Sequence, residues 1–208
     1  IELQNNVVNN ALLQLKPSRF SWQSQQRQQH FEINAGTLQW HNTDLGWQLD
    51  SHALSLETNG KAWPQLALQL RNENNMLFFA ANQIELSMLA PIAALSRHLD
   101  DATFDYIAGL QPRGRVNNVK LKLPLDNWQA LQYQLQLGSF SSNAWQGLPA
   151  LNNVDLAITG LIDKGVGQLS LADSEIDVRE YFPHQWQFEK LSSDFEWSVY
   201  RDETGNNF

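Results

Sequence analysis

The chain has 208 residues, enough for one domain or at most two, and its formal charge of −8 argues against a polynucleotide or an anionic membrane surface as its main partner. Charged side chains form 17% of the sequence, and polarity comes instead from 21 Gln and 19 Asn. Cysteine is absent, which excludes disulfides, thiolate metal sites and a cysteine nucleophile.

The beginning of the chain carries no recognisable targeting signal. Residues 1–4 contain no initiator Met, no basic region and no apolar leader, so we expect the sequence to be an internal segment of a longer protein. The longest nearly apolar run, Met88 to Leu95, is far shorter than the ~20 residues that cross a bilayer. The sequence therefore predicts no transmembrane segment.

Apolar residues recur at every second position along almost the whole chain. This period of two places apolar side chains on one face of a strand and polar side chains on the other. It predicts about a dozen antiparallel strands, with a sheet that is apolar on one face and wet on the other. The clearest runs lie within residues 13–22, 38–56, 66–70, 119–125, 131–137, 154–158, 169–178 and 195–199.

One segment near the middle breaks this alternation. Apolar residues between Leu86 and Leu99 recur at three- and four-residue spacing, which predicts a helix of about three turns. Asp100 or Asp101 can cap a second short helix, which Gly109 and Pro112 are expected to end. The sequence thus predicts a helical insert at about residues 86–109 that buries its apolar face against the sheet.

No sequence pattern points to catalysis, a metal or a cofactor. His98, Asp100 and Asp101 lie close together, but their spacing is more typical of a solvated helix end than of ligands on one helix face. Two acid pairs occur at i, i+2 on the predicted wet faces of strands, where we expect them to be solvated: Asp173 with Glu175, and Asp194 with Glu196. We therefore predict a non-enzyme without a cofactor.

The apolar alternation is compatible with two architectures. In a sandwich, two apolar sheet faces fill each other; in a curved open sheet, the apolar face lines a trough that a lipid chain can complete. The eight tryptophans are similarly ambiguous, because they are either core residues or stacking surfaces for sugars. We expect Trp40, Trp47 and Trp197 to be buried, since they follow the apolar alternation, and Trp128 and Trp145 to be the more exposed ones.

Two stretches resemble a known family. Residues 89–95, followed by Leu110-Gln111-Pro112-Arg113-Gly114-Arg115-Val116 and a strand, are similar to the YhdP branch of the AsmA-like proteins of Gram-negative bacteria. Residues 148–160, followed by Gly167-Gln168-Leu169-Ser170-Leu171, resemble the same family's loop, strand and second strand. We place the resemblance at about residues 30–200.

The resemblance implies a mainly β fold with a curved antiparallel sheet that forms an elongated hydrophobic groove. The 208 residues would form a single segment of a longer, repeat-like β-groove protein. That protein would be periplasmic and anchored in the inner membrane, with phospholipid acyl chains and neighbouring segments of the same chain as its partners.

Two functional hypotheses follow. The first is a lipid-transport module that shields acyl chains between the inner and outer membranes without catalysis. The second is a carbohydrate-binding β-sandwich that uses Trp63, Trp128 and Trp145 as stacking surfaces. Under the first hypothesis, we expect fourteen residues to line the groove: Leu66, Leu68, Leu70, Val119, Leu121, Leu123, Tyr133, Leu135, Leu137, Val154, Leu156, Ile158, Leu169 and Leu171.

Overall fold

The computed structural model describes residues 2–4, 7–24, 27–93, 101–179 and 181–199. Strands dominate this part of the chain, as the alternation predicts. In chain order they are β1 (Glu2–Gln4), β2 (Val7–Leu15), β3 (Ser18–Ser24), β4 (Arg27–Thr43), β5 (Gly46–Thr58), β6 (Lys61–Ala62), β7 (Leu66–Glu73), β8 (Met76–Glu85), β9 (Arg113–Pro124), β10 (Gln132–Ser142), β11 (Ala150–Leu161), β12 (Lys164–Asp177) and β13 (Trp186–Ser198).

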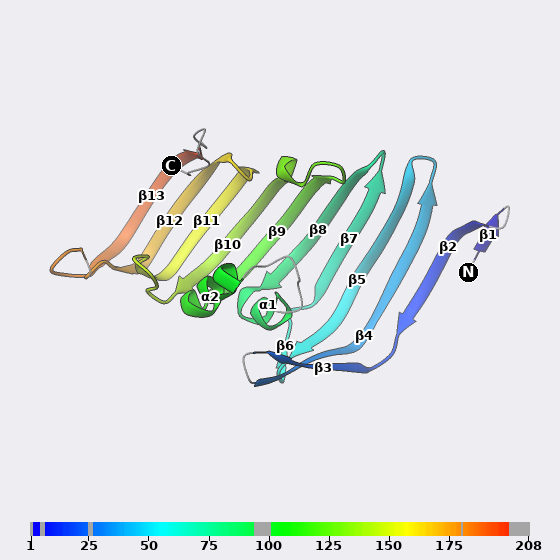
Figure 1. Ribbon diagram of the computed structural model, residues 1–208, viewed down its shortest axis with the longest axis horizontal. Coiled ribbons are helices and arrows are strands. Elements are labelled where there is room, and N and C mark those ends of the chain that lie inside the picture. The colour runs from blue at the N-terminus through cyan, green and yellow to red at the C-terminus, as the bar shows by residue number, and fades with distance from the viewer. Residues whose placement is uncertain (1, 5–6, 25–26, 94–100, 180, 200–208) are drawn as a thin grey trace.

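The thirteen strands of the described residues form one antiparallel sheet. Its main path runs β1-β2-β4-β5-β7-β8-β9-β10-β11-β12-β13, while β3 pairs only with β4, and β6 only with β5. Figure 1 shows this path as a row of strands from the N-terminal edge to the C-terminal edge. No second sheet covers the first in the described part of the chain, so the sandwich is the wrong architecture.

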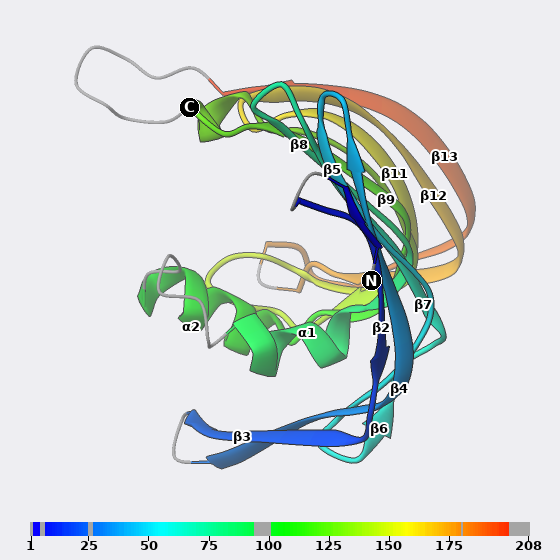
Figure 2. The same cartoon turned by 90° about the vertical axis from the view of Figure 1, so that its right-hand side faces the viewer.

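The sheet is strongly curved, and both helices lie inside the curve (Figure 2). Near the N-terminal end, β4 bends, so that its first half pairs with β3 and its second half with β2. Gly36 sits at this bend, where a Cβ atom would lie 2.5 Å from Leu54 Cδ2. The buried Ser51 hydroxyl donates a hydrogen bond to the Thr37 carbonyl at 2.7 Å, which satisfies a polar group inside the bend.

The helical insert consists of α1 (Leu86–Ala93) and α2 (Asp101–Leu110). The predicted continuation of the first helix to Leu99, together with His98 and Asp100, lies outside the described residues. Gly109 does not end the second helix, contrary to the prediction. The helix continues to Leu110, and Gln111 takes up the left-handed conformation (φ 44°) that a glycine often supplies.

Gly109 has a packing role instead. The Trp145 indole lies against it so closely that a Cβ atom on residue 109 would approach a Trp145 ring carbon to 2.0 Å. The absence of a side chain therefore allows the β10–β11 connection to pack on α2.

The buried core lies on the concave face beneath the insert. Its fully buried members come from β5, β7, β8 and β9, and Leu86 of α1 packs against them. The first helix of the insert thus covers part of the sheet, as the sequence predicts, while Leu95 and Leu99 of the predicted apolar helix face lie outside the described residues. The buried members of this cluster are Leu54, Leu56, Leu66, Ala81, Val116 and Val119.

Candidate functional site: an apolar concave face

Strand β10 shows how the sequence separates the two faces of the sheet. Gln132, Gln134 and Gln136 are exposed, whereas the alternating Tyr133 and Leu135 are half-buried. Side chains alternate between faces along a strand, so the amides lie on the convex face and the apolar residues on the concave face. The strand therefore has one wet face and one apolar face.

Strand pairing extends this separation across the sheet. Directly paired residues point to the same side, and the register aligns Leu70, Phe79, Leu121 and Tyr133 in one transverse row. A second row joins Leu137, Leu156 and Leu169. By pairing and alternation, all fourteen predicted residues share the concave face.

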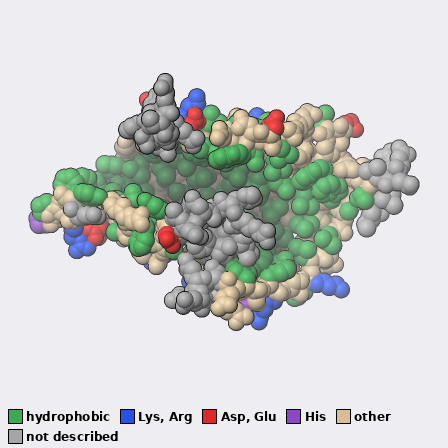
Figure 3. Space-filling view, in the orientation of Figure 1, with side chains coloured by type: hydrophobic (Ala, Val, Ile, Leu, Met, Phe, Trp, Pro, Cys, Tyr) green, Lys and Arg blue, Asp and Glu red, His purple; other side chains and the backbone are tan. Residues whose placement is uncertain are grey.

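Most of this face remains partly open. Of the fourteen residues, four are buried: Leu66, Val119, Val154 and Leu171. The other ten are half-buried although they are large and apolar. In the space-filling view, hydrophobic side chains fill the hollow, while charged side chains lie mainly around the outline (Figure 3). This arrangement is an extended apolar trough with a polar rim.

Aromatic side chains line the trough toward its C-terminal edge. Trp197 and Phe195 of β13 lie over Gly165 and Gly167 of β12, where Cβ atoms would approach ring carbons to 2.4 Å. Trp197 also stacks on Tyr133, with a centroid distance of 6.5 Å. The glycines therefore let two rings lie flat on the sheet.

A second aromatic pair lies near the N-terminal edge. Trp40 and Trp47 stack with ring centroids 4.8 Å apart and an interplanar angle of 19°. Both rings are half-buried, as is Trp197, so the predicted burial of these three is only partial. These aromatics are not among the fourteen predicted lining residues, although their alternation with polar neighbours places them on the apolar face.

The tryptophans of the carbohydrate hypothesis do not form one surface. Trp63 packs against the core, and its indole N–H donates to Thr58 Oγ1 at 2.9 Å. Trp145 packs on Gly109. Of the two tryptophans expected to be exposed, only Trp128 is, with 65% of its surface accessible.

The concave face offers little acid–base chemistry. Burial raises the pKa of the Tyr133 hydroxyl, so the neutral phenol is favoured at physiological pH. No group of three or more His, Asp or Glu side chains in the described ranges is placed to hold a metal ion. The residues brought together on this face can exclude water and contact apolar ligands.

These features define a class of protein, an open β-groove with an apolar concave face and a polar convex face. The chain belongs to the YhdP family, because the family model described as "YhdP protein" matches residues 1–206. The match begins at residue 1, so the family extends further toward the N-terminus than the predicted start near residue 30.

One curated relative is the Intermembrane phospholipid transporter YhdP of Escherichia coli (strain K12). It is 22% identical over 180 residues, a region that covers 81% of this chain and 14% of the relative. The chain thus spans about a seventh of that protein's length. No solved structure matches the chain. Within the described residues, neither helix is long and apolar enough to span a bilayer.

Proposed function

We propose that this chain is a segment of a phospholipid conduit, in which the concave face shields acyl chains from water and the headgroups remain at the polar rim. The observation that carries the proposal is the size of the uncovered apolar face, with ten of fourteen predicted lining residues only half-buried. A soluble domain rarely leaves such a surface empty. The printed name of the E. coli relative supports a phospholipid as the ligand.

Shielding requires no chemical step. Each CH₂ group that leaves water contributes about 0.8 kcal/mol, so a partly covered acyl chain gains several kcal/mol. That gain is spread over many leucine and valine contacts and does not depend on one residue. A chain held in this way can slide along the trough, because successive positions present similar apolar surfaces.

The two ends of the sheet support continuation into neighbouring segments. β13 and β1 are the terminal strands of the sheet, so each has one edge without a partner strand in the described part of the chain. Such edges readily accept another strand. We propose that flanking segments of a longer chain extend the groove in both directions, in a periplasmic protein anchored to the inner membrane.

Lipid retention by the purified chain tests this function. We expect native mass spectrometry to detect co-purified phospholipid on the unmodified chain. Leu135→Asp should strongly reduce retention, because a carboxylate would be desolvated against an acyl chain. Gln136→Asp adds the same charge to the opposite face of the same strand and should retain lipid. No lipid on the unmodified chain, or equal retention by both variants, contradicts the proposal.

A further inference from the structure

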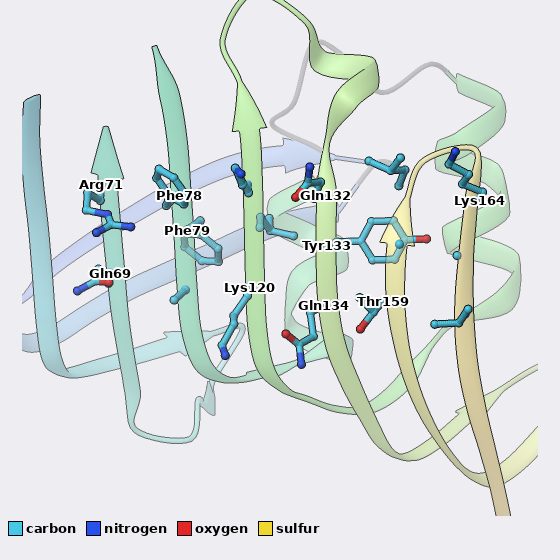
Figure 4. Close-up of a pocket in the computed structure, with 17 residues that line it drawn as sticks. Gln69, Arg71, Phe78, Phe79, Lys120, Gln132, Tyr133, Gln134, Thr159 and Lys164 are labelled. Carbon is cyan, nitrogen blue, oxygen red and sulfur yellow. The ribbon is translucent and has the colours of Figure 1, made fainter. Parts of the chain in front are cut away.

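The convex face contains a pocket of about 670 Å³ that the lipid groove does not explain. Twelve of its 17 lining residues alternate onto the outer face of β7 to β12, and Figure 4 shows Arg71 and Lys164 toward opposite ends. The other five alternate onto the concave face: Phe79, Leu121, Tyr133, Gly160 and Gly165. Trp197 covers Gly160 and Gly165 from the concave side and is not among the lining residues. The pocket therefore opens on the outer face of the sheet.

Positive charge is concentrated in this pocket although the chain as a whole is acidic. Four of the chain's 14 Lys and Arg line it, and none of its 17 described lining residues is Asp or Glu. Glu73 forms an ion pair with Arg71 at 3.3 Å and offsets one of these charges. No ion pair in the described ranges involves the other three cations, which are Lys120, Lys122 and Lys164.

Phe78 helps to place two of the cations. The Arg71 guanidinium carbon lies 4.5 Å from the Phe78 ring centroid, and Lys122 Nζ lies 5.9 Å from it. Both distances are within the range of cation–π attraction. Because one ring interacts with cations from β7 and β9, their charges remain close together when the pocket is empty.

The remaining lining residues combine a few polar groups, which suit the hydroxyls of a ligand, with a larger apolar surface. Gln132 and Gln134 are exposed amides that can both donate and accept hydrogen bonds, whereas the Gln69 amide already donates to Asp50 Oδ1 at 2.8 Å. Phe78, Ala80, Leu161 and Val166 add apolar surface from β8, β11 and β12. Strands lie about 4.8 Å apart, so the backbones of β7, β9 and β12, which carry the positive side chains, are separated by roughly 10 and 14 Å. That spacing exceeds the size of a phosphate ion and matches a short chain of sugar rings.

We propose that this outer pocket binds an acidic oligosaccharide. The lysines would pair with its carboxylates, the glutamines with its hydroxyls, and the apolar surface with the C–H faces of its rings. The site lies on the opposite face from the lipid groove and does not depend on the proposed lipid function.

The test is an amide NMR titration of the purified chain with digalacturonate, with lactose as the neutral disaccharide. We expect digalacturonate to shift the side-chain amide signals of Gln132 and Gln134 and to bind at least tenfold more tightly than lactose. The double variant K120Q/K122Q should weaken binding at least tenfold, since each charged hydrogen bond contributes about that factor.

The double variant K61Q/K190Q is the matched control, because it removes two exposed charges outside the pocket lining. It should leave the affinity within twofold, and neither double variant should change phospholipid retention. No binding, or equal binding of lactose, overturns the proposal. So does equal or tighter binding of inorganic phosphate or tetraglutamate, since the pocket would then be a simple anion site or a site for an acidic peptide.

Discussion

Truncation of two leucines on the same apolar face distinguishes an open trough from a sealed core. Leu171 is 1% exposed and lies between its paired residues Val154 and Leu191. Leu156 belongs to the same face but is half-buried. We compare Leu171→Ala with Leu156→Ala, which remove the same atoms from closed and open parts of the trough.

The burial of each side chain sets the expected losses of stability. Removing three buried carbon groups at Leu171 forfeits about 2.4 kcal/mol of transfer free energy, and the cavity raises the total to about 3–5 kcal/mol. At Leu156 about two thirds or more of the transfer free energy is at stake, but solvent fills the space, so the expected loss is about 1.5–2 kcal/mol.

Urea unfolding of delipidated protein measures this difference, because bound lipid would stabilise the folded state of either variant. With a slope of roughly 2–3 kcal/mol per molar urea, the midpoint of Leu171→Ala should lie about 1 M below that of Leu156→Ala. Equal midpoints with an equally large loss in both would refute the open trough, because Leu156 would then be packed as tightly as a core residue.

Two further predictions concern single contacts. Gly46→Ala should reduce the free energy of unfolding by about 3 kcal/mol, because the new Cβ would lie 2.0 Å from the Asn72 carbonyl oxygen. Gly60→Ala is the control: nothing lies within 4 Å of the new Cβ, so it should cost only the strain of its left-handed backbone, about 1 kcal/mol. Similar urea midpoints for the two variants would refute the clash at Gly46. The hydrogen bond from Arg179 lowers the pKa of Asp177 to about 2, so the pair's contribution to stability is complete above about pH 4 and is lost as the pH falls toward 2. In Arg179→Gln, the carboxyl signal of Asp177 should titrate near 3.9 by NMR, and an unchanged titration midpoint would contradict the role of this hydrogen bond.

The sequence predicts the strands and their faces well because period two is a local property. Gln132 to Leu137 alternate in the sequence as they do between the two faces of β10. The helical insert breaks that period and is equally recognisable. The same local signal also places Lys120 and Lys122 on the polar face, since they alternate with Leu121.

The register and the number of layers could not be predicted. Asn118, Ser139 and Asn153 adopt positive φ angles of 51°, 50° and 58° at or beside irregularities that shift strand pairing, and such residues also occur in ordinary strands and turns. The outer pocket depends on this register, because it joins residues from six strands. Alternation likewise says that a face is apolar but not what covers it, so one sheet and two packed sheets give the same pattern.

Site-specific photocrosslinking on two neighbouring residues tests the lipid groove most directly. A photoreactive amino acid at Leu135 would lie on the concave face, and the same amino acid at Gln136 would lie on the convex face. After illumination in cells, we expect phospholipid to be attached at position 135 and not at position 136, as measured by mass spectrometry of the purified adduct. Equal attachment at both positions, or attachment at position 136 alone, would contradict the account that the concave face conducts lipid.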